Sequence, residues 1–227
     1  VVSKQFLSGI RGKVEKTNKG GAMSQNSSSQ SSFFALISRM RYIERWSLMR
    51  NSRSESLAEH ALDVAVISHC LATIANVRYH RNLDADRAAL IGMYHDASEI
   101  ITGDMPTPVK YANSEIRDAY HQVEARAEKT ILSTLPEDLQ DAYAQVLTHS
   151  AEKSESEAYL RKLIKAADKI AALIKCIEEA QSGNSEFITA EASTRGVVED
   201  LADSLPEVRD FMTEFLPSYG ETLDQLL

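Results

Sequence analysis

The sequence has few of the features that mark secreted, membrane-spanning or nucleic-acid-binding proteins. Its only two cysteines, Cys70 and Cys176, fall within helical apolar patterns, which favours buried thiols over a disulfide framework. No stretch approaches the roughly 18 consecutive apolar residues of a membrane span, and the N-terminus lacks the apolar core of a secretory signal. The net charge of -8 argues against binding to polymeric nucleic acid, because that affinity depends on Lys and Arg neutralising phosphates. We therefore expect a soluble, cytoplasmic protein without a membrane partner.

Length and composition predict one folded domain behind a tail. The 227 residues, 43% of them hydrophobic and 26% charged, suffice for one core of ordinary composition. Residues 1–32 are rich in Ser, Gly, Lys and Gln, and the run SQNSSSQSS cannot bury enough apolar surface to order itself. We predict a disordered tail over 1–32 and a single domain over 33–227. The tail could be an organellar leader, an expression remnant or a segment ahead of a natural start at Met23.

Helical periodicity continues through the predicted domain. From Phe33 onward apolar residues recur every three and four positions and strand patterns are almost absent, which predicts an all-α fold. Gly183 is suited to end one long helix. Expected helix starts are the N-caps Asp84, Asn113 and Ser154 and the capping boxes Thr134-Leu-Pro-Glu137 and Ser204-Leu-Pro-Glu207. Since neither a repeat nor a sustained heptad is present, we expect one compact helical bundle.

Four polar residues stand where this periodicity predicts apolar faces. His95 and Asp96 are adjacent near the end of the apolar run RAALIGMYHDASEI, and both are costly to bury without a partner. His60 begins an otherwise apolar helix, and Asp168 follows Ile164 by four residues on an apolar stripe. Singly, such a His is more often a hydrogen-bonded core residue, and such an Asp usually pairs with Lys or caps a helix. Together, two imidazoles and two carboxylates suit a divalent metal ion held between helices.

The order of these residues resembles the H…HD…D signature of the HD-domain metal-dependent phosphohydrolases. Beyond the signature, roughly Phe33 to the C-terminus is similar to the bacterial HD-domain 5′-deoxynucleotidases. The segments that carry this similarity are RWSLMRN from Arg45, the pair Glu59-His60, HDASEIITGDMPTPVKY from His95 and AADKIAALIKCIEE around Asp168. The resemblance implies an HD-domain bundle that hydrolyses 2′-deoxyribonucleoside 5′-monophosphates to the deoxyribonucleoside and phosphate. It also implies a homodimer.

The resemblance assigns the metal ligands, and helical spacing adds a candidate catalytic residue. By resemblance His60, His95, Asp96 and Asp168 hold one divalent ion, and Co²⁺, Mn²⁺ or Cu²⁺ supports turnover. Glu99 follows His95 by four residues and Asp96 by three, so on a helix it projects from the same face. We expect Glu99 to orient or deprotonate the attacking water, with proton delivery to the leaving 5′-oxygen as a second role. The alternative for Glu99 is an exposed carboxylate at a helix end.

Four further residues are candidates for substrate binding. The Arg45 guanidinium can offer a planar set of donors to phosphate, and in the resembling family an Arg-Trp pair borders the phosphate, which assigns Trp46 to its orientation. The loop GDMPTPVK is restricted by two prolines. By resemblance Asp104 in this loop accepts the sugar 3′-hydroxyl and Thr107 lines the pocket.

Two other functions stay open at this stage. One is another HD hydrolase acting on a cyclic nucleotide, a triphosphate or a signalling nucleotide, although a triphosphate would call for more cations than Arg45 alone. The other is a catalytically inactive HD fold that serves as a binding module, which would be expected to lose a ligand or Glu99. The sequence keeps all five residues, which favours the monophosphatase.

Overall fold

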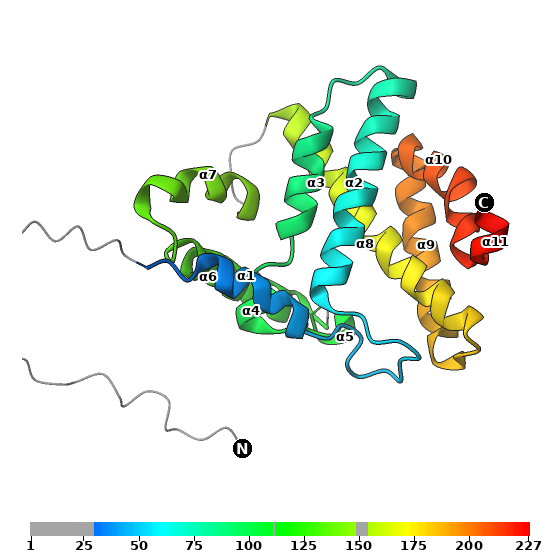
Figure 1. The fold of residues 1–227 in the computed structure, drawn as a ribbon, viewed down its shortest axis with the longest axis horizontal. Helices are drawn as coiled ribbons and strands as arrows, with labels where there is room; N and C mark the ends of the chain where they lie inside the picture. Colours follow the sequence, from blue (N-terminus) through cyan, green and yellow to red (C-terminus); the bar gives the residue numbers. More distant parts are fainter. Residues whose placement is uncertain (1–29, 111, 149–153) are drawn as a thin grey trace, which may run out of the picture. The chain divides into compact units, whose positions relative to one another are not determined.

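The computed structural model describes residues 30–110, 112–148 and 154–227, and these ranges are helical with a single isolated bridge and no strand (Figure 1). The helices are α1 (Phe33–Ile37), η2 (Ser38–Tyr42), α2 (Leu57–Tyr79), α3 (Ala85–Tyr94), α4 (Glu99–Thr102), α5 (Thr107–Lys110), α6 (Ser114–Leu132), α7 (Glu137–Leu147), α8 (Glu155–Gln181), η3 (Ser185–Phe187), α9 (Ile188–Ser204), α10 (Pro206–Glu214), η4 (Leu216–Gly220) and α11 (Leu223–Leu226). The all-α prediction is confirmed.

The predicted tail over 1–32 lies outside the described residues except at its last three positions. Ser31 is one of these, and its hydroxyl donates to the carbonyl of Thr134 at 2.7 Å, between α6 and α7. Phe33 opens α1 and is fully buried. The disorder of the tail and the domain limits of 33–227 stay predictions.

The main core lies where α2 packs against α3 and α8, and α8 continues it against α9. Apolar stripes at helical spacing supply this core, as the periodicity predicts. The fully buried aliphatic residues on these helices include Val64, Leu71, Ala88, Leu163, Ile170, Leu173 and Val198. Since all the predicted metal ligands lie in α2, in α8 or in the turn that follows α3, packing of this core decides their distances.

Helix α3 lies close against α2 at Gly92. A Cβ atom at this glycine would lie 3.0 Å from the Cα and 3.2 Å from the N of Ala65 in α2, and 3.2 Å from Ser68 Oγ. A side chain there would have to displace backbone. Gly92 is therefore the position that lets the end of α3 lie against the start of α2.

Helix α2 is long and apolar enough to pass a length-and-composition test for a membrane span. Its mean hydropathy over the best 18-residue window is 1.3, and 56% of that window is buried inside the protein. The central place of α2 in the core accounts for this composition, because a helix buried on several sides is apolar on several sides.

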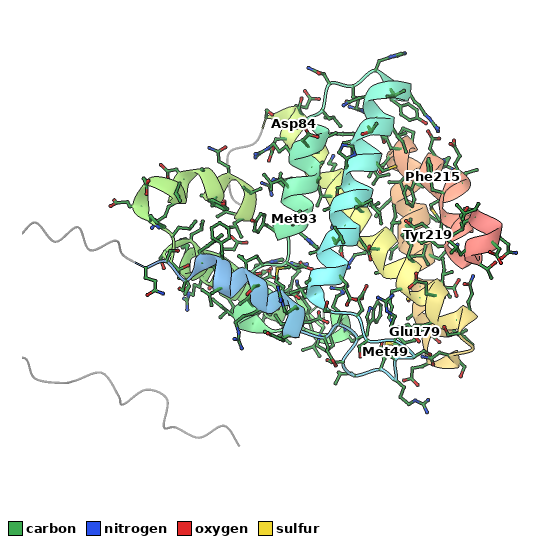
Figure 2. The ribbon with its side chains drawn as sticks, viewed as in Figure 1. Met49, Asp84, Met93, Glu179, Phe215 and Tyr219 are labelled. Atoms are coloured by element: carbon green, nitrogen blue, oxygen red, sulfur yellow. The ribbon has the colours of Figure 1, made fainter. Side chains whose placement is uncertain are left out.

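The predicted helix starts divide into two groups. Asp84, Asn113 and Ser154 each accept a backbone N–H of their helix, so these N-caps are confirmed; Asp84 is marked at the start of α3 in Figure 2. Both predicted capping boxes are wrong. The hydroxyls of Thr134 and Ser204 donate back to carbonyls of the preceding helices, and proline or leucine occupies the cap position. Proline fixes the backbone just before or at the new helix, which begins without a side-chain cap.

Gly183 ends α8 as predicted. It follows the C-cap Ser182 and has φ +81°, a backbone conformation that glycine adopts without strain.

Candidate active site

The four predicted metal ligands come together from three parts of the chain. His60 lies in the first turn of α2, His95 and Asp96 follow α3, and Asp168 lies in the middle of α8. One potential ligand atom from each lies within 4.8 Å of all the others. His60 Nε2 is 3.2 Å from Asp168 Oδ1 and 3.8 Å from Asp96 Oδ2, and His95 Nε2 is 2.9 Å from the same Asp96 oxygen. Two imidazoles and two carboxylates thus converge on one point.

The histidine nitrogens fit a metal ion. Among the described residues, Nε2 of His60 and Nε2 of His95 are buried and face carboxylate oxygens without forming a well-aligned hydrogen bond. A buried polar nitrogen without a partner is costly, and a coordinated cation removes that cost. His95 Nδ1 lies 2.7 Å from the Gly92 carbonyl, an arrangement in which Nδ1–H donates and the Nε2 lone pair is left toward the cluster. The ligand set therefore suits a borderline or hard divalent ion.

Charge in the cluster is unevenly distributed. Burial and the nearby Arg45 charge lower the pKa of His60 to about 4, so this imidazole is neutral and able to coordinate. Burial also opposes a charge on His95, but Asp96 outweighs it and raises the His95 pKa to about 9. Burial opposes the charge on Asp168 too, yet His60 and Lys169 hold its pKa well below the usual range. Since a metal-bound imidazole must be neutral, a divalent cation bound here would displace the proton that Asp96 favours on His95.

The helix that carries His95 ends earlier than predicted. Helix α3 stops at Tyr94 and a turn covers His95–Ser98 before α4 begins at Glu99. In a continuing α-helix the Gly92 carbonyl would accept from the N–H of Asp96, but the His95 ring takes this acceptor. The turn instead has hydrogen bonds between residues three apart, as in a 3₁₀-helix; one of them runs from Glu99 N–H to the Asp96 carbonyl at 2.9 Å. Because side chains three residues apart eclipse in such a turn, Glu99 still lies on the side of Asp96.

Glu99 is buried, which rules out its alternative as an exposed carboxylate. Its exposed fraction is 6%, and its Oε2 has no hydrogen-bond partner among the described residues. Burial, followed by the charges of Asp96 and Asp104, raises the Glu99 pKa to about 9. A carboxylate with a raised pKa is a stronger base than an exposed one.

Arg45 lies beside the cluster, on the loop between η2 and α2. Its Nη1 is 3.7 Å from Asp96 Oδ2, and its side chain is only 12% exposed. Burial disfavours the charge, but Asp168 and Asp96 outweigh this and keep the Arg45 pKa above its usual value. The structure therefore places a permanent positive charge next to the predicted metal ligands.

Sequence reasoning missed Glu55, which joins Arg45 to Trp46. Glu55 Oε2 accepts from Arg45 Nε at 3.2 Å and from Trp46 Nε1 at 3.1 Å. Glu55 lies just ahead of α2, outside any periodic apolar stripe, and nothing in the local pattern distinguishes it from surface glutamates. The one sequence feature that could have indicated Glu55 is its place in the segment RSESLAEH, between the Arg-Trp pair and His60.

The predicted sugar-binding residues lie in the loop after α4. Gly103 ends α4 with φ +73°, and Asp104 follows it, half-buried. Burial raises the Asp104 pKa, while Arg45 and the Trp46 backbone N–H lower it, so Asp104 is within electrostatic reach of the Arg-Trp pair. The backbone of Thr107 begins α5, but its side chain lies outside what the structure describes.

Comparison with known families identifies the chain. The family model described as 5′-deoxynucleotidase YfbR-like matches residues 32–219. The chain belongs to this family. A 5′-deoxynucleotidase of Pectobacterium atrosepticum is 44% identical over 197 residues, which cover 87% of this chain and 96% of the relative. The 5′-deoxynucleotidase YfbR of Escherichia coli O1:K1 / APEC is 43% identical with the same coverage.

Solved structures share the fold of this YfbR-like protein. An HD-domain phosphohydrolase from Listeria innocua aligns with a TM-score of 0.71 and 24% identity, covering 83% of this chain and 88% of that one. A cyanophage S-2L HD phosphohydrolase, bound to dA and one catalytic Zn²⁺ ion, aligns with a TM-score of 0.54 and 20% identity over 83% and 96% of the two chains. The helical bundle is thus an HD-domain fold, as predicted.

Proposed function

We propose that the protein is a metal-dependent phosphohydrolase that removes the 5′-phosphate from 2′-deoxyribonucleoside 5′-monophosphates. The observation that carries this proposal is the convergence of His60, His95, Asp96 and Asp168 beside the buried Arg45 guanidinium, in a YfbR-like chain. The products are the deoxyribonucleoside and inorganic phosphate.

His60, His95, Asp96 and Asp168 would hold one divalent cation. When bound, the cation supplies polarisation of a phosphoryl oxygen and lowers the pKa of a water ligand. The unpartnered Nε2 atoms of the two histidines support this role. Co²⁺, Mn²⁺ or Cu²⁺ is our proposal for the ion, because imidazole with carboxylate suits these metals and the family resemblance favours them.

Arg45 binds the phosphate in this proposal. Its Nε is engaged by Glu55, and its Nη1 lies 3.7 Å from Asp96 Oδ2, so the Nη groups can direct donors at phosphate oxygens on the side of Asp96. The fixed positive charge offsets part of the substrate's negative charge, which the four nearby carboxylates would otherwise repel. Trp46 borders the same position and limits how the phosphate group can turn.

Glu99 transfers the proton. In its deprotonated form, the buried carboxylate, made more basic by its raised pKa, takes a proton from the attacking water as the water oxygen bonds to phosphorus. The proton then held on Glu99 passes to the 5′-oxygen as its bond to phosphorus breaks, and the carboxylate is restored. Arg45 and Lys110 lower the Glu99 pKa and so moderate its basicity.

Asp104 accepts the sugar 3′-hydroxyl, and Thr107 lines the same part of the pocket. The half-buried position of Asp104 after Gly103 supports this role, since a carboxylate left without its donor on a 3′-deoxy analogue loses binding energy. A homodimer and a cytoplasmic location complete the proposal and follow from the resemblance and from composition.

The deciding experiment measures phosphate release from dAMP and AMP in parallel, each with EDTA and with added Co²⁺ or Mn²⁺. We expect metal-dependent release from dAMP and little from AMP. Equal release from both would reject the selectivity for deoxyribose, and release that persists in EDTA would reject the metal centre.

A further inference from the structure

Glu55 is a buried carboxylate next to the site. Its exposed fraction is 9%, and it lies one residue before the Ser56 N-cap of α2. A carboxylate in such a position is costly to bury unless charged and hydrogen-bonding partners offset the lost water. The two side chains that donate hydrogen bonds to it, Arg45 and Trp46, are the pair that the proposed function assigns to phosphate.

Both partners donate to the same oxygen of Glu55. Oε2 lies 3.2 Å from Arg45 Nε and 3.1 Å from Trp46 Nε1, so one atom fixes a guanidinium and an indole relative to each other. The Nε bond takes one edge of the Arg45 guanidinium and leaves the Nη groups on the other side. Nη1 is 3.7 Å from Asp96 Oδ2, which places that free edge at the metal-ligand cluster.

The backbone holds the same arrangement. Arg45 N–H donates to the Glu55 carbonyl at 2.9 Å, and Glu44 and Ser56 form an isolated antiparallel bridge. The two ends of the loop between η2 and α2 are thus paired where Arg45 and Glu55 face each other. The Glu55 side chain consequently reaches both donors across a fixed distance.

Trp46 needs such support. Its backbone has φ +56°, a left-handed conformation that is uncommon for a bulky residue, and its ring packs against Phe187 at 5.4 Å between centroids. The Phe187 contact fixes one side of the indole, and the hydrogen bond to Glu55 fixes its rotation about that contact.

We propose that Glu55 is a positioning residue for phosphate binding, which holds the free edge of Arg45 and the ring of Trp46 toward the metal-ligand cluster through one shared oxygen. This inference rests on the proposed function for the identity of the phosphate ester. Glu55 does not touch the reacting atoms; its effect on turnover passes through Arg45 and Trp46.

The test compares Glu55→Gln and Glu55→Asp with wild-type protein. Gln removes the charge that strengthens both hydrogen bonds, and Asp keeps the charge but draws the carboxylate back from both donors. We expect KM for dAMP, and the dissociation constant for inorganic phosphate in the metal-loaded protein, to rise about tenfold, with a smaller change in kcat. Trp46 is the only tryptophan, so its emission and near-ultraviolet circular dichroism report the indole directly, and both should change.

Glu186→Gln is the matched control. Glu186, in η3, accepts at 2.9 Å from Nε of Arg50, which lies on the same loop as Arg45. Among the described residues it makes no hydrogen bond with Arg45 or Trp46. It should leave KM, phosphate binding and Trp46 emission unchanged.

Two results separate this inference from the proposed function. If wild-type protein releases no phosphate from deoxynucleotides, the proposed function fails, whereas the inorganic-phosphate titration still tests Glu55. A folded Glu55→Asp or Glu55→Gln protein with wild-type phosphate affinity and wild-type Trp46 emission would overturn the inference. Glu55→Asp retains the buried charge, so the inference can still be tested with this variant if Glu55→Gln does not fold.

Discussion

Glu99 illustrates how the surroundings of a single residue change its chemistry. Its carboxyl is enclosed by protein, has an oxygen without a hydrogen-bond partner among the described residues, and faces the charges of Asp96 and Asp104. These surroundings disfavour the ionised form, so the carboxylate, when deprotonated, is a stronger base than an exposed one and holds an accepted proton until it is returned.

We predict that Glu99→Gln keeps the metal and loses the reaction. Removing a general acid–base typically lowers kcat by about 10²–10⁴-fold. A general base acts only when deprotonated, so kcat of the wild-type protein should rise with pH as Glu99 loses its proton. This rise should be absent from the pH profile of Glu99→Gln. Metal content by elemental analysis and kcat with dAMP check this. Exposed Glu115→Gln serves as control, and an unchanged kcat in Glu99→Gln would remove Glu99 from the mechanism.

At the residue scale, sequence reasoning succeeds where a residue contradicts its local pattern. His60 and Asp168 could be predicted because each interrupts an apolar helical face. Glu55 could not, because its two partners reach it through a loop whose pairing depends on tertiary contacts rather than on spacing. Thr134 and Ser204 could not either, since a hydroxyl two residues before proline has a competing acceptor in the preceding helix.

At the scale of helices, the approach of α2 and α3 places the two histidines. The ring centroids of His60 and His95 are 5.3 Å apart, and this spacing depends on Gly92, whose carbonyl also accepts from the His95 ring. The sequence shows a helical glycine here but not that Ala65 backbone lies opposite, so this constraint could not be predicted.

We expect Gly92→Ala to destabilise the protein by about 1–3 kcal/mol, because the added methyl group must push helix backbones apart. Metal affinity should weaken as well, since His95 moves with the glycine carbonyl. Urea unfolding and metal titration measure the two effects.

Gly196→Ala in α9 gives a control of opposite sign. Nothing lies within 4 Å of the Cβ it would add, so higher helix propensity should stabilise the protein by up to about 1 kcal/mol. Destabilisation by both substitutions would show that the close approach at Gly92 is not the cause.

A buried ion pair at the end of α8 anchors the loop that carries Arg45 and Trp46. Glu179 pairs with Lys175 and accepts the backbone N–H groups of Ser52 and Arg53 at 2.8 and 3.2 Å. Figure 2 shows Glu179 at this end of α8, where the loop with Met49 passes. Burial opposes the charge, but Lys175 and the other donors outweigh it and hold the Glu179 pKa well below its ordinary 4.5.

Glu179→Gln should cost about 3–5 kcal/mol near neutral pH, because it leaves Lys175 buried without its charge partner. A lowered folded-state pKa stabilises the protein above the unfolded value and loses that stabilisation as pH falls. Wild-type stability should therefore fall more steeply below about pH 4.5 than that of the variant. Denaturant midpoints across pH test this, with exposed Glu178→Gln as control; parallel pH profiles for wild type and Glu179→Gln would contradict it.

At the scale of the whole molecule, the site exists only when several distant segments are packed. The proposed metal ligands come from α2, the turn after α3, and α8, and neither helix pair alone brings all four together. The bound ion and the folded core should therefore stabilise each other.

We predict that chelation lowers the melting temperature of wild-type protein. A metal present at about 100 times its dissociation constant contributes about 2.7 kcal/mol, which corresponds to roughly 5–10 °C in a chain of this size. Asp96→Ala should lose the metal, the phosphate release and the response to EDTA while its helices stay folded by circular dichroism. Asp86→Ala, whose side chain is 99% exposed, should behave as wild type. An equal response to EDTA in Asp96→Ala would exclude this metal centre.

The convergence of the four ligands has a further consequence for the unfolded chain. The protein has no disulfide between its two described cysteines, both of which are free thiols. An ion held by His60, Asp96 and Asp168 would act as a reversible cross-link that closes two long loops of the chain at one site. Closing long loops removes much conformational entropy from the unfolded chain, so such a link stabilises the folded state. Binding of the metal would then oppose the separation of α2, α3 and α8.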